Sequence, residues 1–301
     1  MSEVVRAGRR RIEISHPEKV LFPDAGITKL DLARHYERVA GVMVPHVKGH
    51  PVAMHVFPNG VDAGGFFVKD APAHFPEWIP RAELAKRGGT VTHVLASDAA
   101  TLVYLANQNC ITPHIWLSRA DRPDHPDRLI FDLDPSRQRF AEVRAAARAF
   151  GDLLRDLGLP PFAMTTGSRG LHVLVPLRRT APFDEVRRFG RLAARTLADR
   201  HPRRLTTEQR KAKRGERIFI DVNRNAYAQH AVAPYAARPR SNAPVATPLR
   251  WEELDDRRLR PDGWTIRTIG DRLASEGDAW RGLSRQRATL GRALRQLEAE
   301  G

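Results

Sequence analysis

A mixed α+β fold is predicted by the alternation of apolar, strand-like runs with amphipathic, helix-like stretches along the 301-residue chain. Two further features of the sequence agree with a folded domain of this class. Hydrophobic residues make up 42% of the sequence, which is enough for a sizeable core. No apolar run approaches the roughly 18 to 20 residues that a membrane span needs. The length leaves room for one large domain or two small ones. We predict a single domain over residues 1–301, helical from about 250 to 301.

The composition also limits the compartment and the partners. The basic N-terminus, Met1 to Arg11, is not followed by an apolar signal core. The only cysteine, Cys110, excludes an intrachain disulfide and a cysteine-rich zinc site. We therefore expect a cytoplasmic protein. Fifty Lys and Arg against thirty-five Asp and Glu give a formal charge of +15, which favours a polyanionic partner.

The N-terminal part predicts two strands around one helix. A short strand is expected at Arg11 to Ser15, and a second at Pro51 to Phe57. Between them, Thr28 is a good N-cap and Asp31 stands in a capping-box position. Apolar residues then recur at helical spacing until Pro45, where we expect the helix to end.

Two candidate ligand-binding groups lie in this part of the chain. Lys19 precedes the helix by one loop and Lys29 opens it, and two lysines at a helix N-terminus favour an anion. Further on, Phe66 is followed by Phe67 and, two residues later, by Lys69. In a strand, Phe67 and Lys69 face the same way, which suits a stacked base or sugar beside a phosphate. Solvated lysines and partly buried phenylalanines remain the alternative.

The alternation continues over the next residues. Residues 70–89 are rich in proline, glycine and charge, which predicts a mobile surface loop. Thr90 to Ala96 is a plausible strand. Asp98 caps a helix that runs to Asn109, and Thr112 to Leu117 is a strand that carries His114.

The stretch that organises the chain is Leu129 to Ser136, in which three apolar residues lead into two aspartates. Since side chains alternate along a strand, Asp132 and Asp134 point to the same face. Two carboxylates without a local basic partner repel each other, and a divalent cation relieves that repulsion. Pro135 cannot extend a central strand, so the pair stands where the strand ends. A turn-capping aspartate pair remains the alternative.

A polar hairpin follows a predicted helix from about Phe140 to Leu157. Residues 162–176 have the pattern of a strand, a tight glycine turn and a second strand. Four polar side chains gather around the turn, namely Thr166, Ser168, Arg169 and His172. Hydroxyls, backbone amides, a guanidinium and an imidazole suit phosphate oxygens, although a plain hairpin with a polar tip explains the pattern as well. The run lacks the G-x-x-x-x-G-K of a Walker loop.

A third acidic strand lies further on, after an amphipathic helix at Pro182 to Arg200 and a flexible basic arm at Pro202 to Arg217. Residues 217–224 repeat the earlier pattern, because an apolar strand delivers Asp221. After Pro248 the chain is mostly helical, with helices expected at 251–254, 265–276 and 284–300.

Together the three strand-borne aspartates form the donor set needed for two-metal nucleotidyl transfer. Two cations would activate a 3′-hydroxyl and stabilise a leaving pyrophosphate, while the basic exterior would hold a template and primer. Two other classes stay open. One is a non-catalytic nucleic-acid-binding or end-binding module, which has no need of three carboxylates. The other is a metal-dependent nuclease, which uses similar carboxylates.

The motifs resemble those of the polymerase domain of bacterial ligase D, within the archaeo-eukaryotic primase superfamily. The resemblance runs from His16–Pro23 to about Trp280, and it includes the D-x-D strand, an S-x-H-type hairpin at 166–172 and the third acidic strand at 218–221. Segments 66–69 and 233–235 also match. It implies an α+β, primase-like fold in which antiparallel sheets form a central cleft flanked by helices. It also implies a stand-alone form, without ligase or nuclease domains.

The resemblance implies an activity and partners. Such a DNA-dependent primase-polymerase extends a 3′-hydroxyl along a template, prefers ribonucleotides, and uses two divalent cations, with manganese favoured over magnesium. It fills gaps or repairs ends in non-homologous end joining. Its partners would be NTP or dNTP, DNA with a gap, break or 5′-phosphate, a Ku-type end-binding protein and a separate ATP-dependent DNA ligase. The protein would then be nucleoid-associated.

The resemblance also implies roles for individual residues. The catalytic metal ligands would be Asp132, Asp134 and Asp221. The incoming nucleotide would be bound by His114, Thr166, Ser168, Arg169, His172, Arg224 and Arg238. The 5′-phosphate side of the DNA would be held by Lys19, Lys29, Phe66, Phe67 and Lys69. A mobile DNA-binding loop near the metal site would contain Arg214.

Three residues depart from the pattern of the family. Relatives commonly carry Ser at the position of Thr166 and Lys at the position of Arg169. Both changes keep the type of functional group, but Arg169 is bulkier and its donors are forked. His55 stands where relatives tend to have Arg or Lys. These departures affect the expected substrate preference more than the expected activity.

Overall fold

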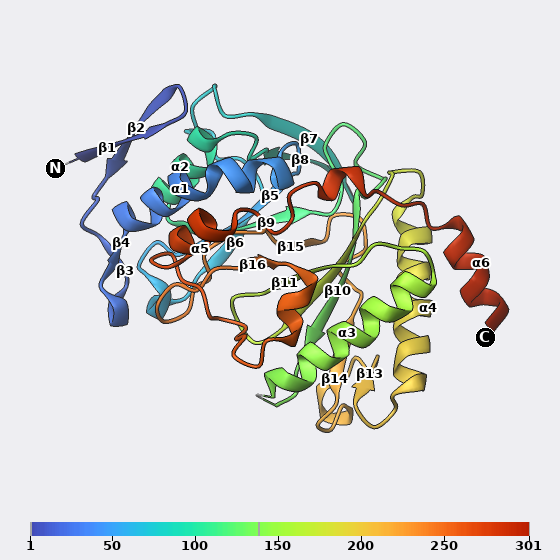
Figure 1. Cartoon of the computed structure of the whole chain (residues 1–301). Coiled ribbons are helices and arrows are strands. Elements are labelled where there is room, and N and C mark those ends of the chain that lie inside the picture. Colours follow the sequence, from blue (N-terminus) through green and yellow to red (C-terminus); the bar gives the residue numbers. More distant parts are fainter. Residues whose placement is uncertain (1, 138, 301) are drawn as a thin grey trace. The chain divides into compact units, whose positions relative to one another are not determined.

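The computed structural model describes residues 2–137 and 139–300, which fold into two compact units built from separate segments (Figure 1). Unit 1 consists of Met1–Asp121, His230–Thr247 and Trp264–Asp278. Unit 2 consists of Arg122–Gln229, Pro248–Gly263 and Ala279–Gly301. The chain therefore crosses between the units several times. Our expectation of a single domain over residues 1–301 stays a prediction.

Unit 1 contains an antiparallel sheet and three two-stranded ribbons. The sheet has the order β15 (His230–Val232), β9 (Cys110–Trp116), β5 (Val52–Val56) and β6 (Phe66–Val68). The ribbons pair β1 (Ser2–Ala7) with β2 (Arg10–Ser15), β3 (Val20–Phe22) with β4 (Ile27–Thr28), and β7 (Arg81–Lys86) with β8 (Gly89–Val94).

The helices of unit 1 are α1 (Lys29–Val47), α2 (Ala99–Asn107) and α5 (Ile269–Glu276), with short 3-10 turns at Pro23–Ala25 and Val61–Ala63. The capping box that opens α1 is present, because Thr28 and Asp31 each accept from the other's backbone amide. The prediction that α1 ends at Pro45 is wrong. Proline removes one hydrogen bond to the preceding turn, and within the last turn of a well-packed helix that loss is tolerated.

The main sheet of unit 2 has six strands. Their order is β13 (Leu205–Thr206), β14 (Ile218–Asp221), β10 (Arg128–Asp134), β12 (Leu171–Pro176), β11 (Phe162–Thr165) and β16 (Thr247–Leu249). The pairs β14–β10, β10–β12 and β12–β11 are antiparallel, and β13 runs parallel to β14. The central strand β10 is therefore hydrogen-bonded on both sides.

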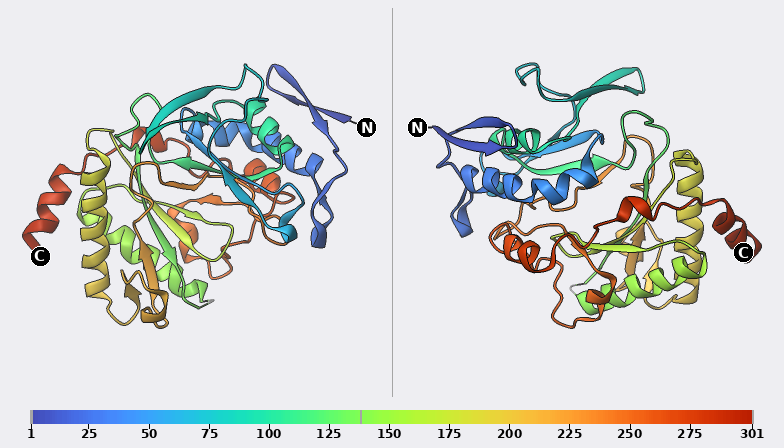
Figure 2. Two further views of the ribbon diagram at one scale, coloured as in Figure 1. Left: turned by 180° about the vertical axis from the view of Figure 1, so that it is seen from behind. Right: turned by 45° about the horizontal axis from the view of Figure 1, so that its top comes forward.

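The helices of unit 2 are α3 (Phe140–Asp156), α4 (Phe183–Arg200) and α6 (Gly291–Glu300), with 3-10 turns at Lys211–Lys213, Trp251–Asp255 and Leu283–Arg285. Helices α3 and α4 pack on the sheet and on each other (Figures 1 and 2). Phe131 of β10 lies 4.1 Å from Phe150 of α3, centroid to centroid, and Leu133 is buried as well. Because side chains alternate along β10, Asp132 and Asp134 point to the other face, away from these helices.

The mixed α+β class is confirmed, and most of the expected elements lie within a few residues of their predicted bounds. Three stretches differ. The helix expected at 284–300 begins only at Gly291, because Ala288 before it is held in a bridge to Leu177. Residues 70–89, expected as a mobile loop, include the whole of β7, and the basic arm at 202–217 contains β13 and a 3-10 turn. Among residues 2–137 and 139–300, no helix is long and apolar enough to cross a membrane.

Candidate active site

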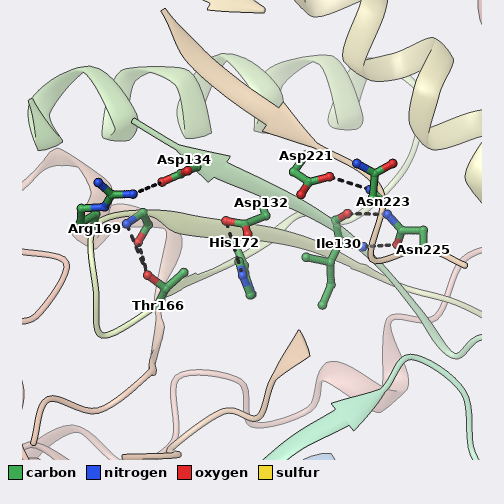
Figure 3. A network of polar contacts seen from close by, with 10 residues as sticks. Ile130, Asp132, Asp134, Thr166, Arg169, His172, Asp221, Asn223 and Asn225 are labelled. Atoms are coloured by element: carbon green, nitrogen blue, oxygen red, sulfur yellow. Dashed lines mark hydrogen bonds and ion pairs between the residues drawn. The ribbon is translucent and has the colours of Figure 1, made fainter. Parts of the chain in front are cut away.

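The register of three neighbouring strands brings the predicted acidic residues together. Asp132 on β10 stands opposite Asp221 on β14 and opposite His172 on β12. Directly opposed residues project from the same face of a sheet, with Cβ atoms about 5 Å apart. Asp134 lies two residues further along β10, on the same face. Figure 3 shows the three carboxylates together on that face.

Basic groups contact two of the carboxylates. Arg169 lies 3.4 Å from an oxygen of Asp134, and His172 Nε2 lies 3.6 Å from an oxygen of Asp132 (Figure 3). The third carboxylate, Asp221, accepts a 2.8 Å hydrogen bond from the backbone amide of Asn223. Each carboxylate thus has at least one positive or polar neighbour, and an ionised carboxylate offers about four lone-pair sites for further partners.

The electrostatics of this group favour an added cation. Burial raises the pKa of the Asp134 carboxyl, and the negative charge of Asp132 raises it further. The cations of Arg169, Arg214 and Lys211 act in the opposite direction and do not fully compensate. Partly buried carboxylates that repel each other are stabilised by a divalent ion, which prefers oxygen ligands.

The donor set fits a divalent cation, although the side chains are not already closed around one. In the described part of the chain, no three His, Cys, Asp or Glu side chains converge on a single ion position. Asp134 is instead drawn toward Arg169. Asp132, Asp134 and Asp221 supply the hard oxygen donors that Mg²⁺ and Mn²⁺ take. Aspartate rotamers can change without moving the strands, so the backbone arrangement already suits such a site.

The hairpin between β11 and β12 fits closely against the acidic strand. The Thr166 amide donates to the Gly170 carbonyl at 3.1 Å, and the Gly170 amide donates to the Thr166 hydroxyl at 3.3 Å. A Cβ atom at Gly170 would overlap the carbonyl oxygen of Leu133, so only glycine allows this approach. The tight turn thereby places Arg169 beside Asp134.

A pocket of about 250 Å³ continues from this hairpin. Ser168 and Arg169 line it together with Arg139 and Arg260. Arginine forks and a hydroxyl are donors that suit phosphate oxygens. His172 is buried, and its Nδ1 has no hydrogen-bond partner among the residues that the structure describes. Three of the predicted nucleotide-binding residues therefore gather near the carboxylates, and Thr166 shapes their turn.

The other two predicted residues of unit 2 lie in the segments that flank β14. Arg224 is half-buried in the turn that follows the strand. Arg214 lies before it, where its guanidinium donates to the carbonyls of Glu208 and Gln209 and stacks 3.7 Å above the ring of Phe219. Arg214 is thus held in place, and it contributes positive charge at Asp134.

One residue that sequence reasoning missed supports the acidic strand. The side-chain amide of Asn225 accepts from the Ile130 amide at 2.9 Å and donates to the Ile130 carbonyl at 2.7 Å (Figure 3). Asn225 therefore continues the backbone ladder of β10 beyond the end of β14. An asparagine in a turn carries no sequence signal that distinguishes this role from ordinary turn formation.

In unit 1, the pairing of β3 with β4 brings Lys19 and Lys29 together. The amide of Lys29 donates to the carbonyl of Lys19 at 2.8 Å. The side chain of Lys29 is buried, and its Nζ donates to the carbonyl of Ser15 at 2.7 Å. Burial lowers the pKa of Lys29, and the charge of Lys19 lowers it further while Glu18 raises it. Two cations held this close together favour an anion.

A cluster of aromatic rings in the same unit contains two of the predicted residues. His55 stacks on Phe67 with ring centroids 4.3 Å apart and planes 11° apart. Phe67 also contacts His114 at 5.1 Å and His230 at 4.9 Å. Phe66, by contrast, is 56% exposed. His230 was missed by sequence reasoning, because only the pairing of β15 with β9 brings it here.

The remaining predicted residues of unit 1 differ in their surroundings. Burial lowers the pKa of His114 well below its usual range, and the positive charge of Arg238 adds to this effect. The same charge lowers the pKa of His55, after the larger effect of burial. Burial and the charge of Arg238 therefore both disfavour the protonated form of these two imidazoles. Lys69 is exposed, directly after β6.

Comparison with known proteins identifies the family of this chain. Residues 28–280 match the family model described as LigD, primase-polymerase domain. The chain belongs to the LigD primase-polymerase domain family. The family is one of polymerase-type nucleotidyltransferases, and the resemblance expected from the motifs is confirmed.

Two relatives are similar to this chain over most of its length. It is 34% identical over 281 residues to the multifunctional non-homologous end joining DNA repair protein LigD of Mycobacterium tuberculosis, covering 90% of the chain and 37% of that protein. It is 30% identical over 299 residues to the LigD of Pseudomonas aeruginosa, covering 98% of the chain and 36% of the relative. The chain thus spans little more than a third of these relatives.

A solved structure extends the likeness to three dimensions. The polymerase domain of Mycobacterium tuberculosis ligase D in complex with DNA matches with a TM-score of 0.87 and 33% identity. The match covers 93% of this chain and 100% of that domain. This chain therefore has the primase-polymerase fold over nearly its whole length.

Proposed function

We propose that this chain is a template-directed nucleotidyltransferase that adds nucleotides to a 3′-hydroxyl at gaps and breaks in DNA. The observation that carries the proposal is the cross-strand register of β10 with β14, which puts Asp221 beside Asp132. A nucleic-acid binder without chemistry needs no such group of acids. Membership of the LigD primase-polymerase family supports the same reaction class.

In this proposal, Asp132, Asp134 and Asp221 hold two divalent cations, with Mn²⁺ preferred over Mg²⁺. When bound, such a pair of ions activates the attacking hydroxyl and stabilises the leaving pyrophosphate. The residues of the chain keep the carboxylates in place. Asn225 fixes the backbone of β10, and Gly170 lets the hairpin approach it.

We further propose that the hairpin binds the triphosphate, with ribonucleotides preferred. Arg169 lies 3.4 Å from an oxygen of Asp134, and a cation bound by that carboxylate would leave the guanidinium available to phosphate oxygens. Ser168 and His172 add donors, and Arg224 adds a nearby cation. On unit 1, His114 and Arg238 are proposed to contact the nucleotide as well, His114 as a neutral imidazole.

The DNA-binding part of the proposal concerns five residues of unit 1 and Arg214 of unit 2. Lys19, Lys29 and Lys69 would hold a 5′-phosphate, and Phe66 and Phe67 would stack on the adjoining nucleotide. Arg214 would belong to a loop that contacts DNA. The solved domain of similar structure is described as being in complex with DNA, which supports a DNA substrate.

The pathway belongs to the proposal too. The relatives are named as non-homologous end joining proteins, and we propose that this chain repairs ends or gaps in that process on nucleoid DNA. A Ku-type end-binding protein and an ATP-dependent DNA ligase would be its partners. The relatives are longer proteins named as multifunctional, and the chain matches little more than a third of each.

The decisive experiment is primer extension by Asp132→Asn and Asp221→Asn on a gapped, 5′-phosphorylated duplex. Each variant keeps the side-chain volume but removes one anionic ligand, so extension should fall by at least about 10³-fold, within the range for loss of a transition-state interaction worth about 4 kcal/mol. Binding of the same DNA, measured by fluorescence anisotropy, should remain within about twofold. Each NTP and dNTP set is tested in Mn²⁺ and in Mg²⁺.

The alternatives give different outcomes. Full extension by either variant would refute the assignment of the carboxylates. Release of nucleotides from a 3′ end by the wild-type protein, without incorporation of NTP or dNTP, would identify a nuclease. Binding of DNA with neither reaction under any metal condition would identify a non-catalytic module of the same fold.

A further inference from the structure

A second basic surface lies in unit 1, at the tip of the β1–β2 hairpin. It is a groove of about 540 Å³, lined by Arg9, Arg10, Arg11, Glu13, Trp78 and Tyr104. We refer to it as the hairpin groove. Its arginines precede residue 28, so they lie outside the residues that match the family model. They are not among the residues to which the family resemblance gives a role.

The charge of the hairpin groove is unbalanced. Three consecutive arginines line it together with a single carboxylate, that of Glu13. Arg9, Arg10 and Arg11 are all exposed. Among residues 2–137 and 139–300, none of the three forms an ion pair with an acidic side chain. The guanidinium of Arg10 instead makes a cation–π contact with an aromatic ring. Three exposed cations against one anion favour an anionic ligand.

The aromatic wall of the groove orients one of these arginines. The guanidinium carbon of Arg10 lies 4.6 Å from the ring centroid of Trp78. Trp78 in turn packs edge-on against Tyr104, with ring centroids 5.8 Å apart. Because the face of Trp78 already holds Arg10, the groove offers positive charge at its surface rather than a free ring for a base. This arrangement favours a sugar–phosphate backbone over unstacked bases.

The wall is also fixed in position. The loop that carries Trp78 is tied down by Arg81, which donates to the carbonyls of Phe75 at 2.6 Å and Pro76 at 3.1 Å. The ring of Phe75 is buried and contacts Tyr104 edge-on at 5.1 Å. The chain itself therefore holds the aromatic wall of the groove in place.

The strand β2 connects the groove to the lysine pair. Arg10 begins this strand and Ser15 ends it. The carbonyl of Ser15 accepts from Lys29 Nζ at 2.7 Å, and its amide donates to Asn107 at 2.9 Å. Five residues of antiparallel strand span about 17 Å. In duplex DNA this distance corresponds to about five base pairs, at about 3.4 Å per pair.

We propose that the hairpin groove binds the backbone of the duplex that lies beyond the 5′-phosphate, about five base pairs from the phosphate held by Lys19 and Lys29. This inference rests on the proposed function, because it takes the lysine pair as the 5′-phosphate site. The arginines then act as a second anchor that distinguishes a long downstream duplex from a short single-stranded end.

The test compares two double variants that remove the same charge. In Arg9→Gln with Arg11→Gln, two groove cations are removed. In Lys86→Gln with Arg87→Gln, two exposed cations at the tip of the β7–β8 hairpin are removed, and neither lines the groove. DNA binding is measured by fluorescence anisotropy without nucleotide or metal, on a 5′-phosphorylated gapped duplex whose downstream arm exceeds one helical turn.

We expect the groove variant to reduce the slope of log K against log salt by about 2, which is about one for each phosphate that the protein no longer neutralises. The control variant should leave the slope within experimental error. Neutral methylphosphonate linkages are then placed about four to seven nucleotides from the 5′-phosphate in both strands. On this duplex the wild type and the groove variant should bind equally.

Other results would overturn the inference. These are a groove variant that binds like the wild type, an equal decrease of the slope in both variants, and a difference that persists on the methylphosphonate duplex. Thermal unfolding of each variant verifies that the hairpin is intact. Primer extension by the wild type tests the proposed function separately, since a protein that binds this DNA but does not extend it refutes only the polymerase assignment.

Discussion

At the scale of single residues, Lys29 serves both the fold and the proposed ligand. Its buried ammonium donates to Ser15 and lies beside Lys19, so part of its hydrogen-bonding capacity is already used by the chain. An ammonium has three donors, which leaves donors for a phosphate. The helix N-terminus that it opens adds favourable partial charge.

Lys29→Gln is expected to remove the preference for a 5′-phosphorylated gap. The loss should be about tenfold to hundredfold in affinity, as for a charge-assisted hydrogen bond of about 1.5–3 kcal/mol. Affinity for the unphosphorylated gap should change little. The measurement is anisotropy on both duplexes, with Arg34→Gln on the exposed face of α1 as the matched control. An equal loss of affinity on the two duplexes would exclude a dedicated phosphate site.

His35 is expected to make the stability of the protein dependent on pH. Burial lowers its pKa from the ordinary 6.5 to about 4, against the effect of its 3.0 Å bond to the Tyr235 carbonyl. A depressed histidine pKa means that the unfolded chain binds more protons, so stability is full above about pH 6.5 and falls as pH drops toward 4. The expected loss between about pH 7.5 and about pH 5 is roughly 2 kcal/mol.

Denaturant unfolding at the two pH values checks this expectation. His35→Gln keeps a donor for the carbonyl of Tyr235 but cannot titrate. The pH-dependent loss of unfolding free energy should therefore be about 2 kcal/mol smaller in this variant than in the wild type. If both proteins show the same pH dependence, other groups cause it.

At the scale of elements, close packing decides which sequence changes a helix accepts. Gly151 in α3 lies under the indole of Trp251, and a Cβ atom there would overlap the ring. Gly41 in α1 is exposed, and a Cβ atom there would meet nothing within 4 Å. Both glycines stand inside α-helices, so intrinsic helix propensity favours alanine equally at the two positions.

Gly41→Ala should therefore raise the unfolding free energy by about 0.5–1 kcal/mol, whereas Gly151→Ala should lower it by about 1–3 kcal/mol. Chemical denaturation of the two variants and the wild type measures both changes. Opposite signs would show that packing of α3 against the 3-10 turn at Trp251–Asp255 outweighs propensity. Stabilisation by both alanines would refute that packing.

Most elements could be predicted from periodicity and capping, and the exceptions have local causes. The capping box of Thr28 with Asp31 set the start of α1 correctly, but the proline rule alone put its end too early. Residues 70–89 have the composition of a loop, yet the pairing of β7 with β8 stabilises part of them as strand. Composition does not reveal such pairing partners.

At the scale of the whole molecule, the charge of +15 is expected to dominate DNA affinity. Binding should weaken steeply with salt, with a slope of about −0.9 for each phosphate neutralised on duplex DNA. Anisotropy titrations between low and moderate salt measure the slope, and replacement of chloride by glutamate provides a control for anion effects. A slope near zero would mean that the basic surface does not contact DNA.

The cluster of three aspartates could be predicted from the sequence, because a short apolar strand that ends in aspartate is a local pattern. Its neighbours could not be predicted as easily. Asn225 and His230 reach their positions only through pairings between distant strands, and such pairings leave no local pattern. The division into two units was not predicted either, since each unit is assembled from three separate stretches of chain.

The opposition of Asp221 to Asp132 has a consequence for how the chain tolerates changes in length. Adding or deleting one residue within β14 would turn the carboxylate of Asp221 toward the helices, because consecutive side chains alternate. The segment between α4 and β14 can absorb such a change, since the strand after it can keep its pairing. The four residues Ile218–Asp221 therefore have to keep their register, while the basic stretch before them tolerates changes in length only outside β13 and the turn that holds Arg214.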